Sequence, residues 1–232
     1  MFGQLSNRES LRDLVLATQA HANKAFRLGF GKAVTKSNLS KANNNRDYRI
    51  FAEFAYRVMS EARQCRATEI FKLSGKVYAF DSSTIDLCLS VFGWALFRKR
   101  KGGIKLHTLY DIETQIPTFF HITPARIHDT RAMDAIPYEE NSFYIFDRAY
   151  NDFGRLFTIN GVGAYFVVRG KNNDFKPMRW KRRLPAGVLS DAIGYMAGQL
   201  TMSKYPEKIR RILYLDPESD RTFIFFTNAL DI

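Results

Sequence analysis

The sequence has 232 residues, of which 46% are hydrophobic and 25% charged, a composition typical of a globular protein with a substantial core. Thirty-five lysines and arginines against 23 aspartates and glutamates give a formal net charge of +12, which favours a polyanionic partner such as nucleic acid. The longest apolar run, residues 87–97, is shorter than the roughly 20 residues that a membrane-spanning helix needs. Charged residues near the N-terminus argue against a secretory signal, and we expect no membrane partner.

Residues 1–70 are predicted to form a small helical module. Ser10 can cap a first helix, Thr35 or a nearby serine a second, and Asp47 a third whose apolar face runs along residues 50–59. The module has 12 lysines and arginines against six aspartates and glutamates, which favours DNA binding. The alternative is an ordinary helical extension with a solvated basic face.

From Gly75 onward the pattern changes to strands, and this predicts a second domain over residues 71–232 with a mixed sheet and flanking helices, an α/β fold. The expected strands are residues 77–80, 103–110, 116–122, 142–146, 164–169, 211–215 and 222–226. Residues 128–135 and 152–159 are expected to form short helices between strands.

Two aspartates, Asp81 and Asp147, each follow one of these expected strands. A carboxylate at the end of a core strand lies at the rim of the sheet, so two of them from separate strands can share a divalent cation. Mg²⁺ and Mn²⁺ prefer carboxylate oxygens and often take one or two protein carboxylates plus a substrate phosphate. In a basic chain this pairing indicates phosphodiester chemistry on nucleic acid. The alternative is that both aspartates cap turns or helices.

Basic residues gather in two further tracts, one between the two aspartates and one near residue 180. Each carries five basic residues in eight, and the first also has a pair of glycines. Flexible basic loops of this kind suit contact with a phosphate backbone, although either could be a solvated loop without a partner. With the two lysines of the helical module, the candidate DNA contacts are Lys36, Lys41, Arg98, Lys99, Arg100, Lys101, Lys105, Lys181, Arg182 and Arg183.

The cysteines and histidines show no metal-binding or redox spacing. Cys65 and Cys88 lie in apolar contexts and are expected to be buried free thiols, which indicates a reducing compartment and a cytoplasmic protein. For the four histidines we favour structural roles, with His128 and Asp129 as a candidate pair behind the metal site.

An ordered set of short stretches resembles the DDE-type transposases of insertion sequences, in the group with a β-rich insertion before the last carboxylate. The stretches are Phe80–Leu87, Gly102–His107, Ile127–Asp129 and Tyr144–Tyr150, preceded by residues 2–13 and 46–51. The resemblance covers nearly the whole chain, and the ordered set is more specific than any single piece.

The resemblance implies a ribonuclease-H-like fold in which Asp81 and Asp147 are the first two catalytic, metal-binding carboxylates and Arg148 is a DNA contact. Residues 171–227 would be the β-rich insertion. The reaction that the family implies depends on Mg²⁺ or Mn²⁺: water cuts the element's end, and the freed 3′-hydroxyl attacks target DNA. The implied partners are double-stranded DNA at the transposon ends and the target, with a homodimer acting on DNA in the nucleoid.

The family's third carboxylate is a glutamate on a helix beyond the insertion, and the 232 residues stop before the place where the resemblance puts it. We therefore expect an internal portion of a transposase, incomplete at both ends and inactive by itself. One alternative is a DNA-binding remnant that catalyses nothing. Another is a metal-dependent nuclease whose site is completed by Glu207 or Glu218.

Overall fold

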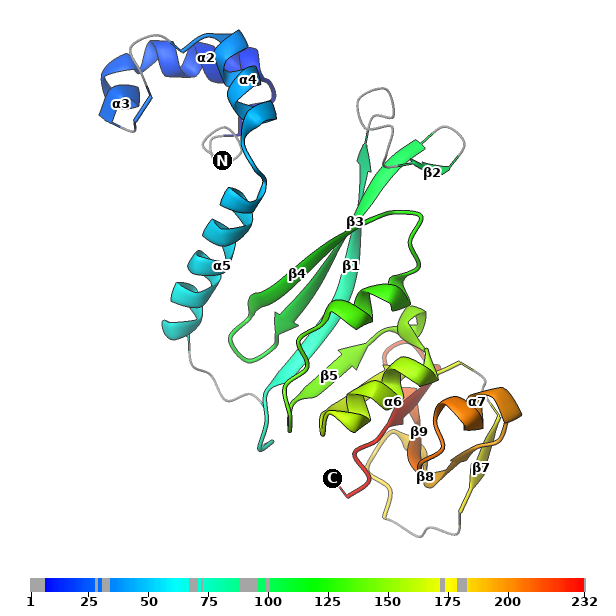
Figure 1. Cartoon of the computed structure of the whole chain (residues 1–232). Coiled ribbons are helices and arrows are strands. Elements are labelled where there is room, and N and C mark those ends of the chain that lie inside the picture. Colours follow the sequence, from blue (N-terminus) through cyan, green and yellow to red (C-terminus); the bar gives the residue numbers. More distant parts are fainter. Residues whose placement is uncertain are drawn as a thin grey trace. The chain divides into compact units, whose positions relative to one another are not determined.

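A computed structural model describes residues 7–27, 29–30, 34–66, 71, 73–87, 96–98, 101–171, 174–178 and 183–231 (Figure 1). The chain divides into two compact units, residues 1–55 and 56–232. The sequence predicts its domain boundary near residue 70, whereas the division between the units falls inside a helix.

The first unit is helical, as predicted. Its helices are α2 (Leu11–Ala20), α3 (Ala22–Arg27), α4 (Lys36–Asn45) and the first part of α5 (Arg49–Gln64). The Ser10 hydroxyl accepts a hydrogen bond from the Asp13 amide at 3.1 Å, and the Thr35 hydroxyl accepts one from the Asn38 amide at 3.2 Å. Each bond satisfies an amide that the first turn of the helix leaves without a backbone partner.

Helix α5 belongs to both units. Tyr56, in the second unit, stacks on Phe120 of strand β4 (Ile116–Pro124) with ring centroids 4.8 Å apart. The apolar face that the sequence predicts for this helix is otherwise left largely exposed, including Phe51, Phe54 and Val58. None of the described helices is both long and apolar enough to span a membrane.

The described strands of the second unit form one ten-stranded sheet with the order β2-β3-β1-β5-β6-β10-β9-β8-β7, and β4 pairs with β3. The strands other than β4 are β1 (Val77–Leu87), β2 (Leu96–Arg98), β3 (Lys101–Asp111), β5 (Phe143–Phe146), β6 (Tyr165–Arg169), β7 (Phe175–Pro177), β8 (Val188–Met196), β9 (Ile209–Asp216) and β10 (Arg221–Thr227).

The first half of this sheet is an antiparallel group, β4-β3-β1, extended by the parallel strands β5 and β6. The short helices η2 (Asp129–Ala135), η3 (Arg148–Tyr150) and α6 (Phe153–Gly161) provide flanking elements (Figure 1). The core joins buried side chains of η2 and α6 to those of the central strands, among them Met133, Leu156, Phe80 and Phe166. This confirms the mixed α/β sheet with flanking helices that the ribonuclease-H-like interpretation predicts.

The strands from β7 to β10 continue the same sheet, because β10 pairs antiparallel with β6. A short helix, α7 (Gln199–Lys204), lies between β8 and β9. The sequence predicts β9 and β10 but neither β7, β8 nor α7.

Two expectations need correction. Strand β1 does not end at Phe80 but continues to Leu87, because residues 81–87 still pair with the long strand β3. Cys65 is exposed and not buried, since it lies just beyond the C-terminal end of α5, away from the core. Cys88 lies outside the described residues.

Candidate metal centre

Asp81 and Asp147 occupy equivalent places on neighbouring parallel strands. The pairing of β1 with β5 ends with Phe80 opposite Phe146, and each of these residues is followed directly by one of the two aspartates. Strand β6 adds Val168 opposite Phe146, so Arg169 follows at the same level. The carboxyl ends of β5 and β6 and the adjoining middle of β1, which we call the carboxyl edge, therefore carry two aspartates and one arginine in a row.

Both aspartates are exposed, and their side chains are available to a ligand. Asp81 Oδ1 accepts a hydrogen bond from the Ser82 amide at 2.7 Å. Asp147 precedes η3 in the capping position, yet its side chain makes no capping hydrogen bond. Asp147 therefore does not cap this helix with its side chain.

Arg169 is not among the predicted site residues, and the structure places it beside Asp147. Its guanidinium lies 3.8 Å from Asp147 Oδ1, and the two side chains are 44% and 58% exposed. The same guanidinium lies over the Phe223 ring, 4.6 Å from its centroid, which restrains the side chain through a cation–π contact. In the sequence, the only indication of Arg169 as a site residue is that it directly follows the apolar residues of an expected strand.

Tyr150 lies buried below this edge. Its phenol is beside Ser82, and its ring packs edge-to-face on Phe80 with centroids 5.3 Å apart. Burial raises the pKa of Tyr150, and the negative charges of Asp129, Asp81 and Asp147 raise it further. The Tyr150 phenol therefore stays protonated at neutral pH.

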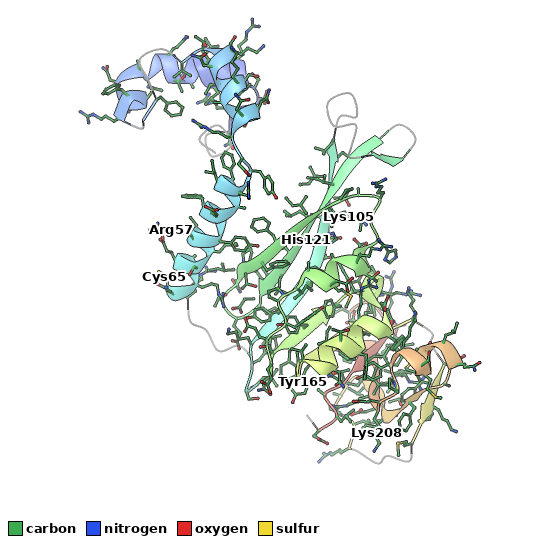
Figure 2. All side chains as sticks on the ribbon, in the orientation of Figure 1. Arg57, Cys65, Lys105, His121, Tyr165 and Lys208 are labelled. Atoms are coloured by element: carbon green, nitrogen blue, oxygen red, sulfur yellow. The ribbon has the colours of Figure 1, made fainter. Side chains whose placement is uncertain are left out.

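Asp129 belongs to a polar cluster next to the two aspartates. Its Oδ1 lies 2.9 Å from Lys105 Nζ and accepts a hydrogen bond from the Ser82 hydroxyl at 3.2 Å. Lys105 also donates to the Ile127 carbonyl at 3.0 Å, and Figure 2 labels this lysine on β3. The cluster ties β3 and the start of η2 to the residue that follows Asp81.

Replacing Asp129 with asparagine should lower the free energy of unfolding by about 1–3 kcal/mol, because the mostly buried Lys105 ammonium would lose the carboxylate that compensates its charge. Urea denaturation measures the change. Asp134→Asn is the matched control, since Asp134 pairs with Arg155 at a more exposed position. Its replacement should lower the free energy of unfolding by less than about 1 kcal/mol. Equal effects of the two substitutions would contradict a special role for the Asp129 cluster.

The predicted pair of His128 and Asp129 is divided between two roles. His128 caps η2, because its Nδ1 accepts a hydrogen bond from the Thr130 amide, while Asp129 faces Lys105 and Ser82. His107 is fully buried with Nε2 2.9 Å from the Thr123 hydroxyl, and burial lowers the pKa of His107. These contacts support structural roles for both histidines.

The predicted DNA contacts fall into four groups. Arg148 and Arg183 are exposed. Lys36 and Lys41 lie on α4 of the first unit. The backbones of Arg98 and Lys101 pair with each other in β2 and β3, whereas the Lys105 ammonium is held by Asp129 and the Ile127 carbonyl. The remaining four lie outside the described residues: Lys99, Arg100, Lys181 and Arg182.

Neither glutamate of the nuclease alternative joins the aspartates. Glu207 accepts a hydrogen bond from Asn160 Nδ2 at 2.8 Å, and Glu218 lies in the turn between β9 and β10. Within the described residues, no three histidines, cysteines, aspartates or glutamates are arranged to hold a metal ion. The donor set at the carboxyl edge is therefore two hard carboxylates, which fits Mg²⁺ or Mn²⁺ if substrate oxygens or water complete the coordination.

A family model described as "Transposase DDE domain" matches residues 72–201. A protein of Sinorhizobium fredii (strain NBRC 101917 / NGR234) named "Putative transposase y4zB" is 32% identical over 197 residues, which cover 82% of this chain and 53% of that protein. The chain thus spans about half the length of this relative.

Among solved structures, the cryo-EM structure of the piggyBac transposase synaptic complex with hairpin DNA is similar to this chain with a TM-score of 0.39 and 10% identity. The match covers 66% of this chain and 33% of that one.

Proposed function

The chain belongs to the family of DDE-type insertion-sequence transposases, and from this premise we propose that Asp81 and Asp147 hold a divalent metal ion for phosphodiester cleavage and strand transfer on DNA. The observation that carries the proposal is the alignment of the two aspartates directly after the paired residues Phe80 and Phe146. Two carboxylates at one sheet edge, exposed in a chain of net charge +12, suit a negatively charged substrate that brings further metal ligands.

When bound, Mg²⁺ or Mn²⁺ would lower the pKa of a coordinated water and neutralise charge on the phosphate. The residues of this chain supply the surroundings. Asp81 and Asp147 present the oxygens, and Arg169 lies close enough to Asp147 to orient its carboxylate. Arg148, exposed directly after Asp147, is placed to contact a DNA phosphate. Protonated Tyr150 and the Lys105–Asp129 pair lie next to Ser82, the residue that follows Asp81.

The proposed substrates are double-stranded DNA at the ends of the element and at the target. Because an element has two ends that must be brought together, we propose that two copies of the protein act on DNA, in the nucleoid. The third carboxylate is proposed to be the glutamate that the family resemblance places beyond the insertion.

The 232-residue polypeptide alone is therefore proposed to bind DNA without catalysis. Within the described residues, Asp81 and Asp147 are not joined by a third metal-ligating side chain. This observation is equally compatible with the alternative of a non-catalytic DNA-binding protein.

Binding of the 232-residue chain to a 30-base-pair duplex of random sequence should weaken steeply with salt, because each neutralised phosphate releases counterions. Six phosphate contacts would give a loss of about 10³-fold in affinity between 50 and 200 mM salt. Fluorescence anisotropy measures the slope. Absence of binding, or binding that does not depend on salt, would contradict the proposal that this protein acts on DNA.

The same preparation tests catalysis. With Mn²⁺ and supercoiled plasmid, the 232-residue chain should nick no faster than its Asp81→Ala variant. Nicking that Asp81→Ala removes would show that these residues hold a complete site and would overturn the proposed need for a further glutamate.

A further inference from the structure

Strand β1 leaves the parallel part of the sheet at Asp81. Its pairing with β5 ends at Phe80, whereas β3 continues beside it as far as Leu87. From Asp81 onward, the described part of the sheet therefore holds β1 along one edge alone. A metal ligand is only as well placed as the backbone that carries it, so a second attachment of this segment bears directly on the Asp81 carboxylate.

Ser82 provides such an attachment. Successive side chains of a strand point to opposite faces of the sheet, so the Ser82 hydroxyl lies on the face opposite to Asp81. There it donates a hydrogen bond of 3.2 Å to Asp129 Oδ1, at the start of η2. The Ser82 backbone amide donates one of 2.7 Å to Asp81 Oδ1. One residue thus joins the proposed metal ligand to a carboxylate 47 residues further along the chain.

The Asp129 carboxylate is itself fixed by a third element. Its Oδ1 lies 2.9 Å from Lys105 Nζ of β3, and the two side chains are 22% and 14% exposed. The backbone of Lys105 pairs with Thr84 of β1. The contacts from Lys105 through Asp129 to Ser82 therefore return to β1, and they hold the peptide after Asp81 by polar interactions that are mostly shielded from water.

The amide hydrogen bond also decides which oxygen of Asp81 is presented to a cation. Among the described residues, only Oδ1 of Asp81 accepts a hydrogen bond, so Oδ2 is the oxygen left to a metal ion. Mg²⁺ demands a near-ideal octahedral arrangement of oxygens, whereas Ca²⁺ accepts a larger and more flexible set and can take both oxygens of one carboxylate. A carboxylate that is held in one orientation therefore favours the smaller ion.

We propose that Ser82, anchored by Asp129, is a positioning residue that holds Asp81 in an orientation selecting Mg²⁺ over Ca²⁺. This inference rests on the proposed function, since it requires a cation at Asp81 and Asp147. It adds a determinant of ion selectivity on the face of the sheet opposite to the ligands, and it gives Ser82 no contact with the ion.

Replacing Ser82 with alanine removes the anchor without changing any charge. The affinity for Mg²⁺ should fall about 10-fold, the lower end of what loss of a group that orients a metal ligand costs. The affinity for Ca²⁺ should change by less than about 3-fold, since Ca²⁺ tolerates a carboxylate that rotates. Both affinities follow from competition against Mn²⁺, whose own affinity is measured in each variant by broadening of the Arg148 amide signal.

Further variants separate positioning from a general loss of structure. Ser82→Ala should remain folded, because Asp129 keeps its ion pair with Lys105, and Ser82→Thr, which keeps the hydroxyl, should restore both affinities. Ser83→Ala, at the exposed neighbouring serine, is the matched control and should leave the ratio of the two affinities unchanged. Adding Ser82→Ala to Asp81→Asn should weaken Mg²⁺ binding no further, because a positioning residue acts only through the ligand that it positions.

Equal losses of Mg²⁺ and Ca²⁺ affinity in Ser82→Ala, or no loss of either, would overturn the inference and leave the proposed function standing. A further loss when Ser82→Ala is added to Asp81→Asn would do the same. Mn²⁺ broadening that is absent from the unchanged protein, or that survives in both Asp81→Asn and Asp147→Asn, would overturn the inference and the proposed metal site together.

Discussion

Replacing Asp147 with asparagine should weaken Mn²⁺ binding at the carboxyl edge of β1 and β5 by at least about 100-fold. Loss of a residue that merely orients a metal ligand typically costs 10- to 100-fold in metal affinity, and here one of two carboxylate ligands is itself removed. Paramagnetic broadening by Mn²⁺ of the Ser82 and Arg148 amide signals in NMR spectra measures the affinity, because these residues directly follow the two aspartates. Asp81→Asn should have the same effect.

Asp86→Asn is the control for this experiment. Asp86 is also an exposed aspartate on β1, but it lies beyond the end of the pairing with β5. Its replacement should leave the broadening unchanged. If broadening survives in both Asp81→Asn and Asp147→Asn, the metal site does not lie at this edge.

Replacing Arg210 with leucine should lower the free energy of unfolding by about 3–5 kcal/mol, since it removes a guanidinium that donates two hydrogen bonds to a buried carboxylate, that of Asp191. Arg210 on β9 donates two hydrogen bonds of 2.8 Å to Asp191 on β8, and the side chains are 11% and 3% exposed. Arg210 also donates to the Ala229 carbonyl at 3.3 Å, so the pair joins β8 and β9 to the segment after β10. Urea unfolding at pH 7 measures the loss.

The double variant Asp191→Leu/Arg210→Leu separates charge burial from packing. Replacing both members of a buried ion pair by apolar residues is often nearly neutral or stabilising, so the double variant should be more stable than Arg210→Leu. A double variant at least as unstable as the single one would show that packing or other contacts of Arg210, and not the loss of its ion pair with Asp191, dominate.

The candidate site could be predicted from the sequence as far as local patterns reach. The aromatic and β-branched runs before Asp81 and Asp147 identify two core strands. Their alignment could not be derived from these runs, because the register of a parallel pair is set by long-range packing across the intervening chain. Arg169 cannot be identified from local patterns for the same reason, since only the pairing of β6 with β5 brings it level with Asp147.

Tertiary pairing also explains the misjudged strands. Residues 81–87 are mostly polar or exposed and lack the apolar alternation of a half-buried strand, yet β3 holds them in the sheet. Strand β8 contains Ser190, Asp191 and Gly194, whose low strand preference is overcome by pairing with β9 and by the ion pair with Arg210. The role of Lys105 is also hidden from local patterns. It lies in a basic tract typical of an exposed loop, whereas its partner, Asp129, is 24 residues away.

Diffraction from crystals of the 232-residue chain soaked in Mn²⁺, recorded at a wavelength where manganese scatters anomalously, tests the proposed metal site most directly. The expected result is an anomalous peak between the carboxylates of Asp81 and Asp147 that disappears in crystals of Asp147→Asn. A peak at another group of side chains, or no peak between two ordered aspartates at saturating Mn²⁺, would contradict the assignment of these residues as the metal ligands of the transposase.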